Sequence, residues 1–539
     1  MKKSAADDEM EGKSMEANSS SRGGWKSAIF IIFVEVAERF SYYGVAGNLF
    51  VYMTTVLRLP TATAAKSVNT WRGVSALFPV AGALLADSYF GRFKTILLSS
   101  VIYLTGLIAL TVAVSAVPPQ LRRTVFFVAL YILAVGEGGH KPCVQTFAAD
   151  QFDETIAEEK AAKSSFFNWW YVGIVGGATA AILVVIYVQT YISWSLGFGM
   201  LTAAVAAALV VFLIGSGGYR RQAPVGSPFT RVAQVIVAAA RKRRLSEREA
   251  RGVYAEESYD IIQDGAAQAL APTAKFRYLG KATLMDEEDE KEKKNRNRNP
   301  WRLCSTTQVE EAKLVFQLVP LWLTCLMFGV VIAQLATFFT KQATAMDRSI
   351  LNSQIQIPPA SFQVFTGLTI LVSVLLYQRF LAHRITTLQR IGIGLAISIL
   401  TMVAAALVES GRVCVARHHG LLDKPNAVVP MAAWWLVPQY VLCGVSDVFT
   451  VVGLQELFYD QMPVGMRSVG AAAYITVTGV GSFLSSGLIA IVQAVTADKW
   501  LAGDNLNRAN LACFYWLLAA MSAVNLCGYA YVAARFLQV

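Results

Sequence analysis

Long apolar runs separated by polar connectors are the feature that most constrains the fold of this chain. Each run is long enough to cross a bilayer, because about 20 residues of helix span its hydrocarbon core. The runs cover residues 28–56, 68–90, 95–117, 122–147, 166–190 and 193–215, and then 312–342, 360–382, 385–408, 431–459, 468–495 and 510–537. Six runs, a charged loop and six more runs are typical of a two-bundle transporter. We therefore predict an all-α membrane protein with twelve transmembrane helices in two six-helix bundles.

The composition supports a membrane protein and argues against several other classes. Of the 539 residues, 55% are hydrophobic and 15% are charged, whereas soluble domains carry about 25% charged residues. We interpret the net charge of +11 as an excess of basic residues on cytoplasmic loops. No stacking aromatic residues accompany the basic clusters, so we expect no nucleic-acid partner. The seven cysteines are scattered without a CxxC spacing, which predicts neither a disulfide framework nor a metal site.

Charge patterning divides the chain into four parts. Residues 1–26 are polar and of mixed charge, and we expect them to form a disordered cytoplasmic N-terminus. Residues 27–215 and 311–539 are predicted to form the two bundles. Residues 216–310 are basic on balance and are predicted to be a long cytoplasmic linker, so both termini also lie in the cytoplasm. Within this linker, Val232–Ala240 is predicted to form a short amphipathic helix on the membrane surface.

Three charged residues inside the first apolar run indicate a functional site. Glu35, Glu38 and Arg39 share one helix face through their i, i+3 and i+4 spacing. A charge at mid-bilayer costs at least about 2.5 kcal/mol, so this face is expected to line a protein interior or a watery cavity. Arg39 can neutralise one carboxylate, and the second is then left over for proton exchange. An ion pair that only locks two helices together is the structural alternative.

Two later apolar runs also contain ionisable residues. Lys141 lies in the fourth run beside a proline, which is tolerated where a helix borders a cavity. We predict that Lys141 pairs with Glu35 or Glu38; the alternative is that its ammonium group snorkels to the membrane interface. Glu137 is a weaker candidate. Glu456 in the tenth run is predicted to be a buried carboxylate of the second half.

The junction between the second and third runs is predicted to be a tight, charged turn with a role in gating. Asp87 can accept a hydrogen bond from a neighbouring helix N-terminus, Gly91 permits the turn, and Arg92 marks the cytoplasmic side. A phosphate on Thr95 could pair with Arg92 and shift a gate, while an ordinary helix-end threonine is the simpler interpretation. Asp150, at the end of the fourth run, is interpreted as solvated.

Short motifs that point to one family are spread over most of the chain. They are Glu35-x-x-Glu38-Arg39-Phe40-x-Tyr42-Tyr43-Gly44, Gly139-His140-Lys141-Pro142-Cys143, Ala149-Asp150-Gln151-Phe152-Asp153, Ser165-Phe166-Phe167-Asn168-Trp169, Asn299-Pro300-Trp301-Arg302-Leu303-Cys304, Val451-x-Gly453-Leu454-Gln455-Glu456 and Met466-Arg467-Ser468. Together they resemble the plant nitrate/peptide transporter family, the plant branch of the proton-dependent oligopeptide transporters. That family belongs to the major facilitator superfamily, whose signature the stretch from Gly82 to Arg92 resembles.

The resemblance implies two pseudo-symmetric bundles around one cavity that opens alternately to each side of the membrane. Protons would be the coupling ion, with no other cofactor. The residues implied in proton coupling are Glu35, Glu38, Arg39 and Lys141. The residues implied in substrate binding are Arg39, Tyr43, Lys141 and Glu456. Protonation of Glu35 or Glu38 would free Arg39 or Lys141 to bind an anionic group of the substrate. Proton and substrate would thus favour the same conformational transition.

Two positions depart from the family pattern. Ile332 stands before Ala333-Gln334, where members that bind nitrate through a histidine carry that histidine, so this mode of nitrate binding is in doubt. Gln378 precedes Arg379 where the family often has an acidic residue, so an acidic gate contact is not expected here.

We therefore expect a proton-coupled symporter, not an enzyme, in the plasma membrane or the vacuolar membrane. Its small-molecule substrate would be nitrate, a di- or tripeptide, or a plant hormone or metabolite. A membrane substrate sensor with little flux and a proton-independent uniporter are the alternatives. Neither the choice among these substrates nor the oligomeric state follows from the sequence.

Overall fold

The computed structural model describes most of the two predicted bundles. The described residues are 23–153, 156–221, 226, 228–245, 276–286, 289, 299–350, 356–381, 384–425, 427–462, 467–496, 500–501 and 505–537. The predicted disordered N-terminus lies outside the described residues up to residue 22. The side chains of Asp87 and Gln378 also lie outside them.

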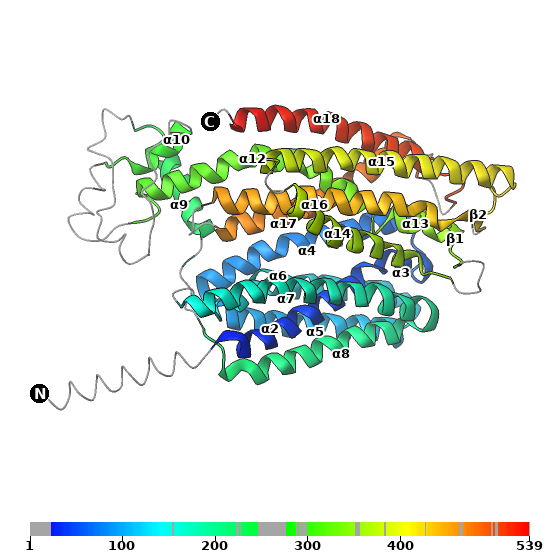
Figure 1. Cartoon of the computed structure of the whole chain (residues 1–539), viewed down its shortest axis with the longest axis horizontal. Coiled ribbons are helices and arrows are strands. Elements are labelled where there is room, and N and C mark those ends of the chain that lie inside the picture. The colour runs from blue at the N-terminus through cyan, green and yellow to red at the C-terminus, as the bar shows by residue number, and fades with distance from the viewer. Residues whose placement is uncertain are drawn as a thin grey trace, which may run out of the picture.

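The first half is a bundle of six long helices among the described residues (Figure 1). They are α2 (Gly24–Ala46), α4 (Thr61–Leu85), α5 (Arg92–Ser115), α6 (Pro119–Ala149), α7 (Ala157–Ala180) and α8 (Trp194–Ile214). Short segments lengthen several of these helices. They are α3 (Leu49–Thr55) after α2, the π-helical turns η1 (Ala86–Phe90), η2 (Ala181–Val185) and η3 (Val188–Ile192) after α4 and α7, and the 3-10 turn η4 (Gly215–Gly217) after α8.

The second half repeats this plan. Its long helices are α12 (Thr306–Ala333), α14 (Val364–Phe380), α15 (Thr387–His418), α16 (Val437–Gln461), α17 (Arg467–Val495) and α18 (Leu511–Leu537). Its short segments are α13 (Phe338–Thr344), η6 (Pro359–Gln363) and η7 (Ala433–Leu436). Two short parallel strands, β1 (Met346–Asp347) and β2 (Val429–Ala432), pair Met346 with Val429 and Asp347 with Ala432.

Polar residues set where two of these helices begin. Ser305 Oγ accepts a hydrogen bond from the Gln308 backbone N–H, and the Gln308 side chain accepts one from the Ser305 N–H at 3.2 Å. Thr386 and Gln389 make the same reciprocal pair at the start of α15. These capping boxes satisfy N–H groups that a helix start leaves without a partner, so α12 and α15 begin at defined residues.

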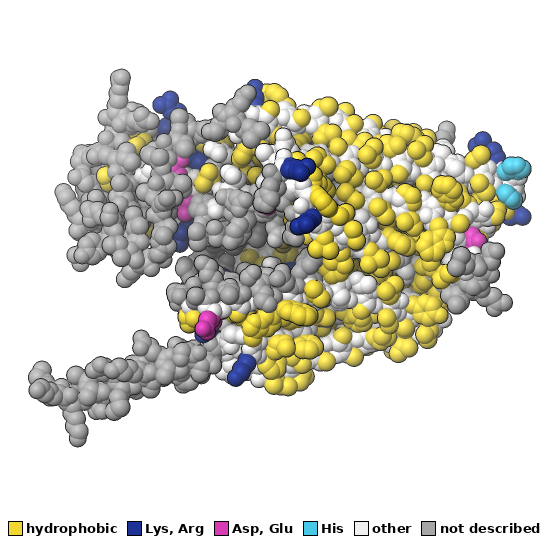
Figure 2. Space-filling model, viewed as in Figure 1, with side chains coloured by type: hydrophobic (Ala, Val, Ile, Leu, Met, Phe, Trp, Pro, Cys, Tyr) yellow, Lys and Arg dark blue, Asp and Glu magenta, His cyan; other side chains and the backbone are white. Residues whose placement is uncertain are grey.

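The apolar helices and the surface agree with a membrane-spanning bundle. Ten helical stretches among the described residues are long and apolar enough to cross a membrane. The two long helices outside this set are α2 and α6, which carry the charged residues predicted to be functional. Figure 2 shows hydrophobic side chains covering the middle of the visible face, with few charged side chains among them. The predicted all-α fold of two six-helix bundles is confirmed.

The two halves meet at one end of the molecule. We call the end with Gly23 and Leu537 the termini end, and the opposite end the far end (Figure 1). Several hydrogen bonds cross between the halves toward the far end: Gln363 Nε2 to Gly47 O at 3.1 Å, Ser361 Oγ to Ile182 O at 3.0 Å, Asn69 Nδ2 to Ser485 Oγ at 3.1 Å and Lys66 Nζ to Gln493 Oε1 at 3.0 Å. The far end is therefore closed by contacts between the halves.

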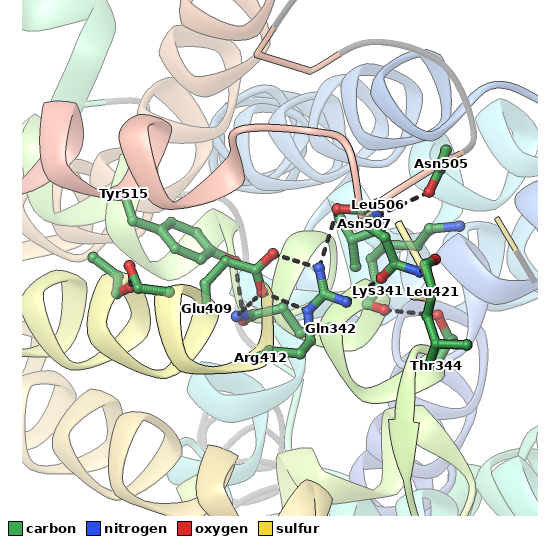
Figure 3. Close-up of polar contacts among 12 residues, drawn as sticks. Lys341, Gln342, Thr344, Glu409, Arg412, Leu421, Asn505, Leu506, Asn507 and Tyr515 are labelled. Carbon is green, nitrogen blue, oxygen red and sulfur yellow. Dashed lines mark hydrogen bonds and ion pairs between the residues drawn. The ribbon is translucent and has the colours of Figure 1, made fainter. Parts of the chain in front are cut away.

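A fully buried polar network joins the far-end segments of the second half (Figure 3). Glu409 and Arg412 of α15 form an ion pair with Nη2–Oε1 at 2.7 Å, and neither side chain has exposed surface. Arg412 also donates to Asn507 Oδ1 at 2.6 Å and to Leu506 O at 3.1 Å, in the segment before α18. Gln342 of α13 donates to Glu409 at 2.9 Å. The network ties α13, α15 and the start of α18 together.

Part of the predicted linker folds against the second half. Helix α9 (Pro228–Arg241) buries Val235, Ala238 and Ala239 in a cluster with residues of α10 (Arg277–Gly280), η5 (Lys281–Thr283) and α12. The predicted short amphipathic helix is therefore present, and its apolar residues Val235, Ala238 and Ala239 pack against the chain itself. The ammonium group of Lys242 is also buried there, 2.6 Å from Asp289 Oδ2.

Candidate functional site

The charged residues of α2 form one cluster inside the first half. Arg39 Nε lies 2.7 Å from Glu35 Oε1 and 3.3 Å from Glu38 Oε2. The two glutamates are 3% and 2% exposed. The structure thus brings together the three residues that share a helix face in the sequence. Arg39 contacts both carboxylates rather than one, but only Glu35 accepts a hydrogen bond from it.

A close approach of α7 fixes this part of α2. A Cβ atom added to Gly177 would lie 2.7 Å from the carbonyl oxygen of Val36 and 3.5 Å from Arg39 Cβ. The first distance is shorter than van der Waals contact allows, so only glycine lets the two backbones come this near. Arg39 is consequently held against α7, and its guanidinium group stays beside the carboxylates of its own helix.

The structure corrects the predicted partner of Lys141. Its ammonium group forms an ion pair with Glu137 of the same helix, one turn earlier, and Glu137 has no exposed surface. The i, i+4 spacing is the signal that identifies this pair in the sequence, although a partner on α2 was predicted. Lys141 Nζ also lies 4.0 Å from the ring centroid of Tyr42, a cation–π contact that links α6 to α2.

Close packing of α4 against α6 positions the Glu137–Lys141 pair. A Cβ atom on Gly82 would overlap the carbonyl group of Gly138 and the Cα of Gly139. Gly82 therefore lies against the backbone of α6, next to the ion pair. Small residues at such contacts allow backbones to approach closely where no hydrophobic effect drives helix association.

Two tyrosines and an aspartate extend the cluster toward the second half. The rings of Tyr42 and Tyr43 meet edge to face, with centroids 5.3 Å apart. Tyr43 interacts electrostatically with Arg39, with Lys141 and with Asp447 of α16. Tyr42 and Asp447 were not among the predicted site residues. An isolated carboxylate in an apolar run is the signal that could have identified Asp447.

Glu456 is not the buried carboxylate that was predicted. Its side chain is 43% exposed near the termini end of α16, where Arg390 Nη1 lies 2.9 Å from its Oε2. Arg390 also donates to Val448 O at 3.1 Å and stacks over the ring of Tyr377, 3.7 Å from its centroid. Glu456 lies in the last turns of α16, where its neighbours Leu454 and Leu457 are buried while its own side chain is partly exposed.

The predicted gating residues lie together at the termini end. Gly91 has a φ of 73°, which favours glycine, and it joins η1 to α5. Arg92 forms an ion pair with Asp150, so the end of α6 is tied to the start of α5 and Asp150 is not the freely solvated residue that was predicted. The Thr95 hydroxyl is buried and donates to Gly91 O at 3.0 Å. This conformation thus shields the predicted phosphorylation site.

Among the described residues, no group of three or more His, Cys, Asp or Glu side chains is arranged so that it could hold a metal ion. The charged cluster contains carboxylates, a guanidinium and an ammonium group in close pairs. Such an arrangement can exchange protons and can present a cation to an anionic group, but it does not supply a nucleophile with an adjacent base.

Comparisons with known proteins identify relatives of this chain. The model of the POT family (PTR2) matches residues 93–506. Protein NRT1/PTR FAMILY 5.4 of Arabidopsis thaliana is 53% identical over 538 residues, which cover 96% of each chain. Protein NRT1/PTR FAMILY 5.10 of the same plant is 45% identical and covers 96% of this chain and 94% of its own.

Solved structures of low sequence identity share the fold. The crystal structure of an auto-inhibited POT family peptide transporter has a TM-score of 0.69 at 21% identity, and the match covers 94% of this chain and 97% of that one. A POT family transporter in complex with 5-aminolevulinic acid has a TM-score of 0.63 at 15% identity, with 94% and 98% covered. The predicted major facilitator fold is confirmed. The family model and the Arabidopsis relatives together show that the chain belongs to the POT family of transporters, as the plant NRT1/PTR proteins do, and not to a family of enzymes.

Proposed function

We propose that the chain is a proton-coupled symporter of a small anionic or zwitterionic solute. The observation that carries this proposal is Arg39 between two buried carboxylates on a membrane helix, with the Glu137–Lys141 pair on the neighbouring helix. Solved structures of the same fold include a peptide transporter in complex with sulfate, which is an anion. Nitrate, small peptides and plant metabolites remain the substrate candidates.

The charge balance of the cluster suggests one proton for each transport cycle. Three carboxylates (Glu35, Glu38, Glu137) lie beside two cations (Arg39, Lys141), so the ionised cluster carries a net charge of −1. One added proton makes the cluster neutral, which lowers the cost of keeping it inside the membrane. Further protons would leave a buried cation in excess unless an anionic substrate group accompanies them.

The proton and the substrate act on the same residue in this proposal. A proton on Glu35 or Glu38 removes the charge that holds Arg39, and the guanidinium group then becomes available to an anionic group of the substrate. Tyr43, one turn after Arg39, packs against a cluster that includes Ala360 of the second half, where it can contact the same solute. Neutralising the cluster in this way would favour one arrangement of the halves over the other.

Alternating access requires the halves to separate at each end in turn. In this structure the halves touch at the far end, and we propose that the termini end faces the cytoplasm and is the side open to solute. Arg92–Asp150 in the first half and Arg390–Glu456 in the second would then form ion pairs of the cytoplasmic side. The plasma membrane and the vacuolar membrane are both compatible with this orientation.

The test is electrogenic uptake in a voltage-clamped cell at acidic external pH, with nitrate and a dipeptide applied separately. We expect an inward current with one of them that is lost in Glu38→Gln and in Lys141→Ala. Asp423→Asn is the matched control, because Asp423 is 71% exposed and far from the cluster. Currents that persist in Glu38→Gln at the same pH dependence would exclude the assigned proton site.

The recording and an uptake assay in reconstituted vesicles together distinguish the alternative functions. A uniporter would carry solute without any response to the proton gradient. A sensor would bind solute in reconstituted vesicles without accumulating it. Either result, obtained with protein shown to reach the membrane, would replace the symporter proposal.

A further inference from the structure

A small cavity lies inside the first half, between α2, α5, α6 and α8. Its polar lining is formed by Glu38 of α2, Ser100 and Tyr103 of α5, and His140 of α6. Apolar side chains of α2 and α8 complete the walls. The room inside is about what one water molecule needs.

Buried polar atoms around this cavity have no hydrogen-bond partner among the described residues. They are both carboxylate oxygens of Glu38, the Tyr103 hydroxyl and His140 Nδ1. The three side chains are at most 4% exposed. Burying an unpaired polar group is unfavourable, and more so for a charged group, so native proteins satisfy such groups through protein or water. Three such groups around one cavity indicate a water site rather than three separate defects.

The charged residues around Glu38 do not supply the hydrogen bonds that its carboxylate lacks. On α2, Arg39 lies 3.3 Å from Glu38 Oε2 without hydrogen-bond geometry and donates instead to Glu35. On α6, Lys141 is paired with Glu137. The α5 residues facing Glu38 are uncharged, and α8 contributes only apolar residues to the cavity. An ionised Glu38 is therefore stabilised only by the 3.3 Å ion pair with Arg39 and by a group bound in the cavity.

We propose that this cavity binds one water molecule that connects Glu38 to Tyr103 and His140 and allows Glu38 to release the transported proton. The inference rests on the proposed function and deepens it. The water donates one hydrogen to the carboxylate and the other to His140 Nδ1, and it accepts a hydrogen bond from the Tyr103 hydroxyl. A hydrogen bond to a charged group is stronger than one to a neutral group, so this water favours the ionised form of Glu38. Tyr103 and His140 are thus positioning residues for proton release.

Infrared difference spectroscopy of the purified protein in lipid, titrated over pH, tests this proposal without any substrate. The carboxylic-acid band of Glu38 is identified by its loss in Glu38→Gln. We expect Tyr103→Phe and His140→Leu each to move the midpoint of this band to higher pH by about one unit, because the water loses a partner that holds its charge-assisted hydrogen bond to the carboxylate in place. His140→Asn should restore most of the shift, since its amide oxygen can occupy the place of Nδ1.

Tyr52→Phe is the matched control. Tyr52 is also a fully buried tyrosine of the first half whose hydroxyl has no partner, but it does not line the cavity. In Tyr52→Phe, the pH midpoint of the Glu38 band should equal that of the unmodified protein. Unchanged midpoints in Tyr103→Phe and His140→Leu, or an equal shift in His140→Asn and His140→Leu, would overturn the water site. A shifted band in a protein without proton-coupled current would instead overturn the symporter proposal, so the two failures are distinguishable.

Discussion

At the scale of single residues, the difference between the two α2 glutamates carries most of the proposed chemistry. Glu35 accepts a hydrogen bond from Arg39, whereas Glu38 has only the longer ion-pair contact. The two carboxylates share a helix face and a cation, yet their surroundings differ. We therefore propose an ion-paired role for Glu35 and a proton-exchanging role for Glu38, which makes Glu38→Gln the more informative substitution.

Outside the membrane-spanning segments, one ion pair predicts a pH dependence of stability. The hydrogen bonds from Arg220 hold the pKa of Glu159 below its usual range. A lowered folded-state pKa means that the pair stabilises the protein above the unfolded pKa and that this stabilisation is lost as the pH falls through the folded pKa. Glu159→Gln should therefore lower the melting temperature slightly at pH 7, because a partly solvated pair contributes less than about 1 kcal/mol to the free energy of unfolding.

The same substitution should make little difference at acidic pH. Thermal unfolding of both proteins in detergent, followed by tryptophan fluorescence between pH 7 and pH 3, measures the effect. The two melting curves are expected to converge below about pH 4, where the free carboxyl group is protonated. A difference that stays constant over this range would show that the pair does not stabilise the protein through its charge.

The residues of the cluster differ in how far sequence could identify their contacts. Glu35, Glu38 and Arg39 are within one helical turn, so helix geometry alone places them on one face. The Glu137–Lys141 pair follows the same rule but was given less weight than a partner on α2. The contact between Arg390 and Glu456 joins side chains 66 residues apart, and it depends on how α15 packs against α16. Local spacing carries no information on such a contact.

At the scale of helices, α15 shows where hydropathy alone is misleading. The apolar run was predicted to end at residue 408, but the helix continues to His418. Glu409 and Arg412 end the apolar pattern because they are charged. In the structure both side chains are nevertheless completely buried. Their mutual pairing and the covering segment at Leu506 and Asn507 allow this burial. A single sequence does not reveal that a distant segment will cover a charged turn.

This buried network predicts a large stability effect for a single substitution. Arg412→Met leaves Glu409 buried without its cation, and removing one partner of a buried ion pair costs about 3–5 kcal/mol. We expect a clear drop in the melting temperature of the purified protein. Arg508→Met is the control, because Arg508 and its partner Asp423 are 69% and 71% exposed and surface pairs contribute little.

A double variant separates the lost pair from lost packing. Glu409→Gln in the Arg412→Met background removes the uncompensated charge and should recover part of the melting temperature. Equal, small effects of Arg412→Met and Arg508→Met would show that the far-end network does not hold these segments together.

At the scale of the whole molecule, the two bundles could be predicted from the sequence, but which end of the molecule is closed could not. Twelve runs and a polar linker are sufficient for the architecture, because each run must satisfy its own backbone as a helix in lipid. Which end is closed depends on contacts between residues hundreds of positions apart, such as Asn69 with Ser485 and Gln363 with Gly47. Transporters populate conformations with either end closed, so a sequence specifies an equilibrium between these conformations rather than one of them.

The far-end hydrogen bonds should set that equilibrium. Asn69→Ala combined with Gln363→Leu removes two of the bonds between the halves, and each hydrogen bond contributes about 1 kcal/mol net. We therefore expect the population with an open far end to rise at least about fivefold. Spin labels at Arg58 and Lys424, both exposed at the far end, report the separation of the halves through their distance distribution. The exposed Cys414, Cys513 and Cys527 must first be replaced by alanine.

The matched control for this experiment removes a hydrogen bond that lies within one half of the molecule. Ser398→Ala removes a buried hydroxyl whose hydrogen bond, to Leu395 O at 2.7 Å, stays within α15. Its distance distribution should equal that of the unmodified protein, while the double variant gains a component at longer distance. If the double variant keeps the original distribution, the apolar contacts between α4 and α17 close the far end by themselves. Equal changes in both proteins would mean that loosening the second half, rather than breaking contacts between the halves, opens the molecule.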